Sequence, residues 1–481
     1  GGRCVVRLME DQWFMKYSDD AWKDLAHRCL DGMKIIPEEV RANFEYYIDW
    51  LNDWACSRRI GLGTRLPWDE RWIIEPLTDS TIYMAYYTIA HRLREMDAGE
   101  MDDEFFDAIF LDDSGTFEDL REEFRYWYPL DWRLSAKDLI GNHLTFHIFH
   151  HSAIFPESGW PRGAVVFGMG LLEGNKMSSS KGNVILLRDA IEKHGADVVR
   201  LFLMSSAEPW QDFDWRESEV IGTRRRIEWF REFGERVSGI LDDRPVLSEV
   251  TPAEPESFIG RWMMGQLNQR IREATRALES FQTRKAVQEA LYLLKKDVDH
   301  YLKRVEGRVD DEVKSVLANV LHAWIRLMAP FIPYTAEEMW ERYGGDGFVA
   351  EAPWPEFSDD AESRDVQVAE EMVQNTVRDI QEIMKILGST PERVHIYTSP
   401  KWKWDVLRVA AEVGKPDMGS IMGRVSAEGV HDNMKEVAEF VRRIIRDLGK
   451  SEVTVIDEYS VLMDASDYIE SEVGARVVIH S

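Results

Sequence analysis

The sequence has 481 residues, enough for roughly three domains of average size. Apolar residues make up 44% and charged residues 30%, a composition that excludes wholesale disorder and a collagen-like fibre. With 59 basic and 87 acidic residues the formal net charge is −28, which argues at first sight against a nucleic acid or an anionic membrane as partner.

The cysteines and the first residues of the chain indicate the cellular location that we expect. Three cysteines, Cys4, Cys29 and Cys56, are too few for a disulfide framework and form no CxxC pair, so we expect a reducing, cytoplasmic location and no zinc site. No apolar run has the length of a membrane span, and the first residues lack the apolar core of a signal peptide. We therefore expect no membrane partner. Because Gly1 stands at the start instead of Met, we expect a piece of a longer protein.

Most of the negative charge lies in three segments. Residues 95–131, 351–382 and 451–473 carry net charges of −12, −8 and −7, which leaves −1 for the rest of the chain. These segments predict solvated acidic faces. By contrast, residues 221–330 hold 19 basic and 17 acidic side chains, so a nucleic-acid partner stays possible for that region.

The first part of the chain alternates short strands and helices, which predicts a parallel α/β sheet. We expect strands at residues 4–8, 131–134 and 164–167, and helices at residues 38–60, at residues 78–94 and in a stretch that includes Leu139, His143, Phe146 and His150. Gly61 and Gly63 are expected to end the first helix, and Asp79 or Ser80 to cap the second.

The remainder reads as a helical bundle followed by a small α+β unit. Residues 217–343 carry long amphipathic stripes, and residues 345–366 read as a Pro-rich acidic linker. In the tail we expect strands at 393–398, 452–456 and 475–479, and a helix at 432–448 that ends at Gly449.

The segment with the clearest chemistry is Lys176-Met-Ser-Ser-Ser-Lys-Gly-Asn183. Two lysines, three hydroxyls and the backbone N–H groups of a glycine-containing loop suit a phosphate that is transferred or leaves. The alternative is a Ser- and Lys-rich surface loop, and the spacing of a Walker loop is absent.

Four segments, in the same order, resemble class I aminoacyl-tRNA synthetases. Residues 176–181 resemble the KMSKS loop, and Asp53-Trp-Ala-Cys-Ser-Arg-Arg59 resembles the DW-x-x-SR signature of the class Ia branch. Residues 195–215 resemble the segment that follows the loop, and residues 327–340 resemble a helix pair of the anticodon domain.

Within this branch the chain resembles leucyl-tRNA synthetases of the archaeal and eukaryotic-cytosolic type, of which it would be the second half. The supporting segments are residues 11–14, 79–87, 135–144 and 396–403. The implied fold class is α/β plus all-α plus α+β. The implied parts are a return segment from the editing insertion (1–30), the second half of a Rossmann-like catalytic domain (31–186), a stem-contact segment (187–222), an anticodon-type helical bundle (223–350), an acidic linker or helix (351–382) and a C-terminal tRNA-binding domain (383–481).

The resemblance implies ATP-dependent activation of leucine and its ligation to leucine tRNA, with Mg²⁺ carried by ATP. The loop that closes over ATP is matched by Lys176, Met177, Ser178, Ser179, Ser180 and Lys181. The family commonly has Lys where this chain has Ser179, and a hydroxyl can hydrogen-bond a phosphate without neutralising it. We hypothesise that Lys181 compensates, so Lys181→Ala in a complete enzyme should abolish most adenylation.

Further residues match the small-molecule sites. Asp138 matches the acid that holds the ATP ribose, the alternative being a salt bridge with Lys137 or a cap. Asn142 and His143 follow on the same helix end and are expected near ATP, although His143 is equally a core histidine. The leucine pocket is matched by Ser80 and Tyr83, the latter otherwise a packed aromatic.

Basic side chains are the candidates for contacts with the acceptor end, the body and the long variable arm of leucine tRNA. They are Arg58, Arg59, Arg224, Arg225, Arg226, Arg270, Lys401, Lys403, Arg442, Arg443 and Arg446. The alternative for the bundle arginines is a solvated face paired with Glu273 and Glu279, and Trp402 or Trp404 would either stack on bases or belong to the core.

The sequence holds no counterpart of the HIGH motif or of most of the editing domain. His147-Ile-Phe-His150 lies on the wrong side of the loop and lacks the glycine. We therefore expect the chain alone to neither activate leucine nor edit, and to need a half that carries both parts. The alternatives are a non-catalytic tRNA-binding subunit, a class Ia synthetase for isoleucine, valine or methionine, and a helical scaffold. The tail's Trp-Lys residues and the lack of cysteine-based zinc sites disfavour another synthetase, and the loop disfavours a scaffold.

Overall fold

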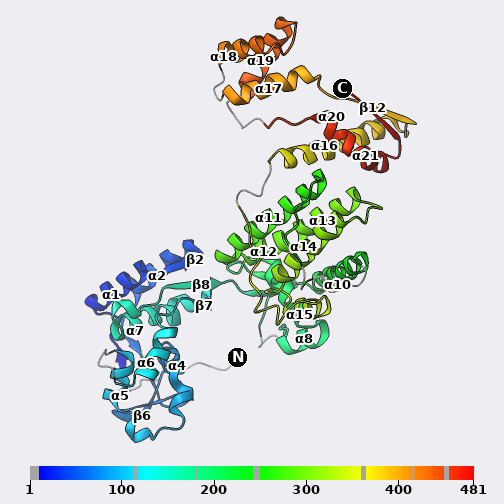
Figure 1. Ribbon diagram of the computed structural model, residues 1–481. Helices are drawn as coiled ribbons and strands as arrows, with labels where there is room; N and C mark the ends of the chain where they lie inside the picture. Colours follow the sequence, from blue (N-terminus) through cyan, green and yellow to red (C-terminus); the bar gives the residue numbers. More distant parts are fainter. Residues whose placement is uncertain are drawn as a thin grey trace. The chain divides into compact units, whose positions relative to one another are not determined.

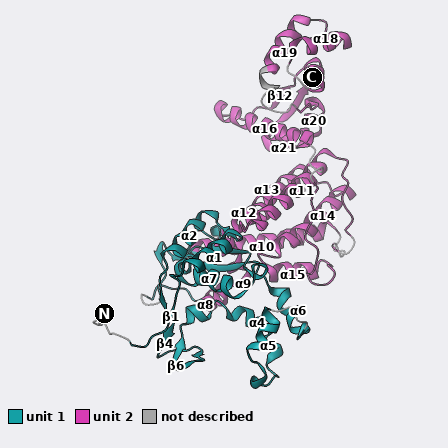
Figure 2. Ribbon diagram, turned by 90° about the vertical axis from the view of Figure 1, so that its left-hand side faces the viewer, with its two compact units in different colours: residues 1–186, 206–217 teal, residues 187–205, 218–481 magenta. Residues whose placement is uncertain are grey.

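The computed structural model describes residues 10–111, 116–178, 182–241, 247, 250–358, 364–413, 417–448 and 454–481. The chain divides into two units, shown in different colours in Figure 2. Unit 1 comprises Gly1–Leu186 and Ser206–Glu217, and unit 2 comprises Leu187–Ser205 and Ser218–Ser481. The predicted segment 187–222 is thus shared between the units, and the predicted strand at 4–8 lies outside the described residues.

Unit 1 contains a three-stranded parallel sheet. Its strands follow the order β2 (Lys34–Ile36), β8 (Gly163–Phe167) and β7 (Arg133–Ala136). β8 is almost wholly buried, which explains its continuous apolar run. A Cβ on Gly163 would meet the Lys34 carbonyl oxygen at 2.8 Å, so only glycine lets these strands approach. The prediction of a parallel α/β sheet is confirmed, with β7 two residues later than expected.

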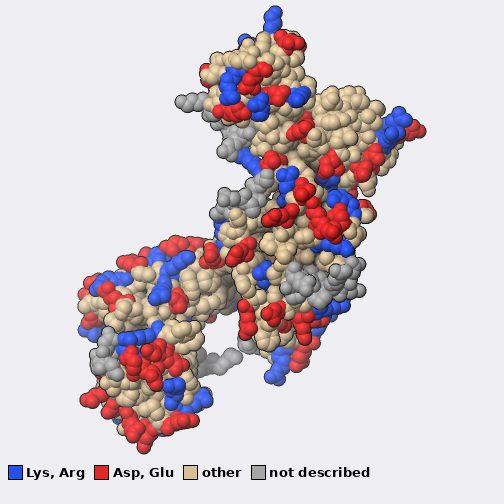
Figure 3. All heavy atoms as spheres, in the orientation of Figure 1, with Lys and Arg blue, Asp and Glu red and all other residues tan. Residues whose placement is uncertain are grey.

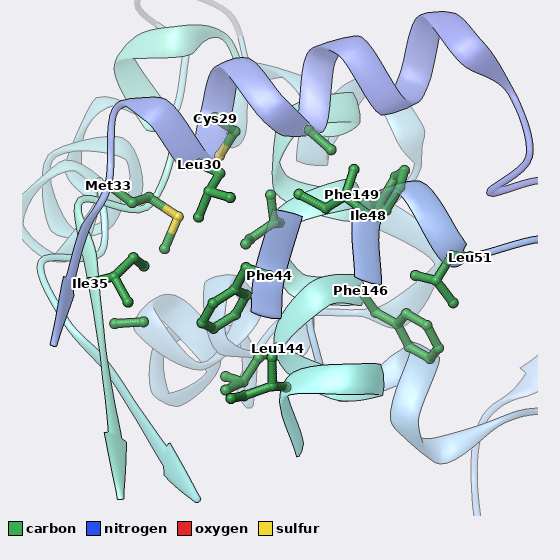
Figure 4. Close-up of a cluster of buried hydrophobic side chains, with 14 of the residues drawn as sticks. Cys29, Leu30, Met33, Ile35, Phe44, Ile48, Leu51, Leu144, Phe146 and Phe149 are labelled. Atoms are coloured by element: carbon green, nitrogen blue, oxygen red, sulfur yellow. The ribbon is translucent and has the colours of Figure 1, made fainter. Parts of the chain in front are cut away.

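Helices α1 (Asp20–Asp31), α2 (Arg41–Trp50) and α7 (Thr145–Ile154) bury an apolar cluster together with this sheet. Figure 4 shows side chains from these elements, among them Leu30, Phe44 and Phe149, pointing toward one another. The 3₁₀ turn Lys137–Leu139 and the π-helical turn Ile140–Leu144 lead into α7.

The predicted helix at 38–60 is too long. α2 ends at Trp50, and short strands follow as β3 (Trp54–Ala55) and β4 (Ser57–Arg58). β3 pairs with β1 (Phe14–Met15), and β4 pairs with β6 (Asp69–Ile74), whose other neighbour is β5 (Arg65–Leu66). Pairing with distant strands therefore overrides the helical periodicity of the segment.

The first acidic segment belongs to a helical layer of unit 1. This layer contains α4 (Tyr83–Leu93), α5 (Asp103–Phe110) and α6 (Glu118–Trp127), whereas the short α3 (Pro76–Asp79) packs through Leu77 against the cluster of α1, α2 and α7. Apolar side chains such as Ile89, Phe105 and Phe124 form the core of the layer. Neither predicted cap begins α4; instead Glu75 caps α3 by accepting the Thr78 N–H at 3.0 Å.

Unit 2 contains the predicted bundle (Figure 1). Its helices are α8 (Leu187–His194), α9 (Ala196–Ser206), α10 (Glu217–Ile240), α11 (Phe258–Glu279), α12 (Thr283–Val287), α13 (Leu294–Arg304), α14 (Asp311–Met328) and α15 (Pro333–Arg342). The π-helical stretch Gln288–Leu293 joins α12 to α13. The predicted stripes, such as Val316 and Val320 in α14, are buried. No helix within the described part of the chain is long and apolar enough to span a membrane.

The tail has two apolar cores, one nested within the other in sequence. The outer core joins α16 (Arg364–Leu387), β12 (Arg393–Tyr397), α20 (Glu458–Asp464), α21 (Ser466–Val473) and β13 (Arg476–His480). The inner core joins α17 (Lys401–Val413), α18 (Met418–Glu428) and α19 (Met434–Leu448).

Two tail strands were predicted correctly and one was not. β12 and β13 lie where expected and pair in parallel. Residues 452 and 453 of the third predicted strand lie outside the described residues, and residues 454–456 are not a strand. Ile456 packs against the outer core from a loop, which explains the apolar residue there.

Candidate functional site

The predicted phosphate loop stands on a small sheet of unit 1. Its base is β10 (Asn175–Lys176), which pairs with β9 (Gly170–Leu172), and β9 pairs in turn with β11 (Phe213–Trp215). The Asn183 side chain accepts the Ser178 N–H at 3.1 Å and donates to the Lys176 carbonyl oxygen at 3.0 Å. The two ends of the loop are thereby held together. Ser179, Ser180 and Lys181 lie outside the described residues.

Two lysines converge beside this sheet. Asp212 accepts the Lys137 ammonium at 2.6 Å and the Met169 N–H at 2.7 Å. The Lys137 hydrogen bond, the Met169 N–H and the charges of Lys137 and Lys176 lower the pKa of Asp212. Lys137 therefore does not pair with Asp138. The exposed Asp138 carboxylate accepts no hydrogen bond from the described residues, so it is available to a ligand.

A second polar group joins Ser80, His143 and Arg133. His143 Nδ1 lies 3.0 Å from Ser80 Oγ, and its Nε2 lies 2.5 Å from an Arg133 guanidinium nitrogen. A guanidinium only donates, so Nε2 accepts and Nδ1 carries the proton that is donated to Ser80. Burial and the Arg133 charge lower the pKa of His143, which keeps the ring neutral.

The neighbouring predicted residues lie around this group. Asn142 accepts the His143 N–H at 2.6 Å through its own side chain. Tyr83 is 39% exposed, with its ring centre 4.7 Å from that of Tyr87, so it is not a core aromatic of the described structure. Sequence reasoning missed Arg133, Lys137 and Asp212, because their partners lie up to 75 residues away.

Two histidines of α7, His150 and His151, serve packing. His150 lies 2.8 Å from the Tyr17 hydroxyl and 2.6 Å from Thr81 Oγ1, and His151 lies 3.3 Å from the Tyr128 hydroxyl. Burial lowers the pKa of His150 to about 3 and that of His151 to about 4. The residues described contain no group of three or more His, Cys, Asp or Glu side chains that could hold a metal ion.

The predicted acceptor-end arginines lie on or beside β4. Arg58 donates to the buried Glu75 at 2.5 Å. The Arg59 guanidinium lies over the Trp72 ring, 4.8 Å from its centre. Both arginines are exposed, so each keeps part of its guanidinium open to solvent.

The four bundle arginines differ in their surroundings. Arg224 donates to the Lys193 and His194 carbonyl oxygens and so caps α8. Arg225 is exposed and has no ion pair among the described residues, while Arg226 lies over the Tyr292 ring.

Arg270 lies inside the bundle. Its guanidinium pairs with Glu289 and with Asp297, both at 2.8 Å, and all three side chains are largely buried. Binding of Arg270 to RNA would have to break both ion pairs. The nearby Arg276 pairs with Glu273 at 3.2 Å on the helix surface, as the alternative expected.

In the tail, Lys401, Arg442 and Arg443 are exposed. Lys403 lies close to the rings of Trp402 and Phe440. Trp402 stacks on His431 and belongs to the edge of the inner core. The side chain of Arg446 lies outside the described part.

Trp404 lines a tail cavity of about 390 Å³. Its other lining residues include Lys401, Arg408 and Tyr459. The buried indole N–H of Trp404 has no hydrogen-bond partner among the described residues.

Several acids of the acidic segments pair with residues other than the tRNA candidates, although Asp457 of the third segment lines the tail cavity together with Lys401. Glu370 of the second segment and Asp464 and Glu472 of the third pair with basic residues of α13. Figure 3 shows basic and acidic side chains mixed on the face in view of both units. The net charge of −28 is therefore compatible with a polyanionic partner.

Comparison with known proteins gives two family matches. Residues 9–226 match the family of class I tRNA synthetases (M), and residues 260–396 match the anticodon-binding domain of tRNA ligases. Over all 481 residues the chain is 99% identical to the leucine–tRNA ligase of Methanothermobacter thermautotrophicus. It is 45% identical over 509 aligned residues to that of Pyrococcus abyssi. The whole chain is matched in both cases and spans 51% of each relative, about half their length.

A solved structure shares the fold. Methionyl-tRNA synthetase of Mycobacterium tuberculosis, bound by methionyl-adenylate, superposes with a TM-score of 0.51 at 17% identity. The match covers 69% of this chain and 62% of that one.

Proposed function

Because the chain belongs to the leucine–tRNA ligases, class I aminoacyl-tRNA synthetases of which it spans about half, we propose that it supplies the half of such an enzyme that closes over the ATP phosphates and binds tRNA. The complete protein would activate leucine with ATP and transfer it to leucine tRNA. The observation that carries this proposal is that the Lys137–Asp212 ion pair lies at the start of β11, in the small sheet whose β10 holds Lys176 at the base of the loop.

The chemistry fits this arrangement. Adenylate formation needs little covalent catalysis, because positioning and charge stabilisation at the phosphates suffice. Lys176 is fixed at its backbone by β10 and by Asn183, while its side chain is exposed. It can therefore meet a phosphate group without first being ordered. The free Asp138 carboxylate, next to Lys137, can accept two ribose hydroxyls.

The Ser80–His143–Arg133 group suits the border of the amino-acid site. His143 stays neutral with a defined tautomer, so it orients the Ser80 hydroxyl without adding a charge. The Arg133 guanidinium lies on the opposite side of the ring from the Ser80 hydroxyl.

Leucine-dependent exchange of pyrophosphate into ATP tests the proposal. In the longer protein that contains this chain, Lys176→Ala should lower the exchange rate about 10²-fold, as loss of one donor to transition-state charge does. Lys16→Ala removes an exposed lysine of unit 1 that pairs only with Asp19, and should change the rate less than twofold. Equal rates for the two variants would contradict the role of the loop.

Assays of the isolated 481-residue chain test which steps this half performs without the rest of the protein. We expect it to bind leucine tRNA but to catalyse no exchange, because the other wall of the ATP site is not within it. Exchange activity of the chain alone would contradict this. Binding of tRNA without any contribution to exchange in the longer protein would favour a non-catalytic module.

A further inference from the structure

The outer face of the two-stranded tail sheet carries an unusual set of side chains. β12 and β13 pair in parallel over five residue pairs, and one face packs on the outer core through Val394, Ile396, Val477 and Ile479. The opposite face carries what we call the sheet platform: Arg393, His395, Tyr397, Arg476, Val478 and His480. None of these residues belongs to the outer core.

Three rings of the platform form one group. Tyr397 stacks on His480, with ring centres 4.6 Å apart and planes at 13°. His395 lies beside His480, edge to edge, and a hydrogen bond of 2.9 Å between ring nitrogens fixes the two histidines. Tyr397 ends the stack and is 75% exposed, so one face of its ring is open to a further ring. A nucleobase stacks on such an aromatic face.

The other end of the platform is basic. Arg393 and Arg476 lie directly opposite each other across the strands, and both are exposed. Neither has an ion pair among the described residues. The neighbouring acids are Glu392, which is exposed, and Glu470, which accepts the Val477 N–H at 2.7 Å. Two like charges directly opposite each other destabilise a sheet. A phosphate placed between these guanidiniums would remove that repulsion, and the strand rise puts it about 13 Å from Tyr397.

We propose that the sheet platform binds an unpaired segment of tRNA, with one base stacked on Tyr397 and the backbone phosphate of a nucleotide further along the segment held by Arg393 and Arg476. This inference rests on the proposed function, because it takes tRNA as the ligand. It adds a site separate from the helices α17 and α19, which carry Lys401, Lys403, Arg442 and Arg443. Stacking on a ring tolerates any base, so the platform adds affinity with little sequence preference.

Equilibrium binding of a fluorescein-labelled leucine tRNA transcript to the 481-residue chain, followed by anisotropy, tests the platform. Tyr397→Ala should raise Kd about tenfold, within the range measured for loss of one base stack. Tyr397→Phe keeps the ring and should bind within twofold of the unaltered chain, and Tyr397→Leu should resemble Tyr397→Ala. Tyr126→Ala, at a tyrosine of α6 that is 79% exposed, is the matched control and should have no effect.

The arginines are tested through salt dependence. The double variant Arg393→Ala/Arg476→Ala should flatten the slope of log K against log salt by about 0.7 for each phosphate that the chain no longer binds. Unchanged binding by Tyr397→Ala would overturn the platform and leave the proposed function standing. Failure of the unaltered chain to bind the transcript would overturn tRNA binding itself. Loss of binding by both Tyr397→Ala and Tyr397→Phe would also overturn the stacking role, because the ring is kept in the second.

Discussion

The joint between the bundle and the tail gives the sharpest stability prediction. Glu370 of α16 is fully buried, and its carboxylate accepts His300 Nε2 at 2.6 Å and Arg304 Nε at 3.1 Å. Arg304 of α13 is itself almost fully buried, with its guanidinium 5.2 Å from the centre of the Tyr468 ring. Glu370→Ala would leave a buried guanidinium with only Asp464, at 3.5 Å, as a weak partner.

Breaking a buried ion pair on one side costs about 3–5 kcal/mol. Since every 1.4 kcal/mol is tenfold, amide hydrogens of α16 and α21 that exchange through opening of the joint should exchange roughly 10² to 4 × 10³ times faster. Hydrogen exchange is the suitable assay because a chain of two units need not unfold in a single step. Glu371→Ala, at the exposed neighbour of Glu370, is the control and should change exchange less than about threefold.

A double variant separates charge from packing. Arg304→Met/Glu370→Leu replaces both ions with apolar side chains, and should recover most of the lost stability, since such exchanges are often neutral or stabilising. If Glu370→Ala accelerated amide hydrogen exchange in α16 and α21 less than fivefold, that would refute the reasoning. So would a double variant as unstable as the single one.

Two further predictions concern the folded units. His150 and His151 have folded-state pKa values of about 3 and about 4, below the unfolded value near 6.5, so the unfolded chain binds protons that the fold does not. Stability of unit 1 should therefore be full above pH 6.5 and fall toward pH 4, by about 2 kcal/mol per histidine at pH 5; a melting temperature that is not lower at pH 5 than at pH 7.5 would contradict this. In the bundle, Arg270→Ala should lower stability by about 3–5 kcal/mol because two carboxylates lose their buried partner. Arg225→Ala should leave the melting temperature unchanged while weakening tRNA binding. If Arg225→Ala lowered the melting temperature and Arg270→Ala weakened only tRNA binding, the structural role of Arg270 and the RNA-binding role of Arg225 would be refuted.

Local patterning predicted the buried elements well. β8 and the apolar stripes of α11, α13 and α14 are buried. Buried positions show in the sequence as a continuous apolar run or as apolar residues at helical spacing. The helix expected at 38–60 was overextended because Leu51 and Ala55 continue the helical spacing. Leu51 is indeed buried, but just beyond the end of α2, and Ala55 lies in a strand.

Residues of the candidate site could be predicted only where they belong to a recognisable sequence motif. Lys176 and Asp138 came from recognisable strings, whereas the roles of Lys137 and Arg133 depend on partners that folding brings together. Arg270 is a case where the pattern held a usable signal. It lies three residues after Leu267 and beside Ile271, at the edge of the buried stripe, so its inward position follows from helical spacing.

The nested order of the tail sets a schedule for its folding during synthesis. The inner core of α17, α18 and α19 uses only residues 401–448, so it can form as soon as these have emerged. The outer core needs α16 from one side of this insert and β13, with residues 476–480, from the other. Residues 476–480 must therefore emerge before β12 gains its partner strand, and the face of α16 that packs on α20 and α21 stays uncovered until those helices have emerged.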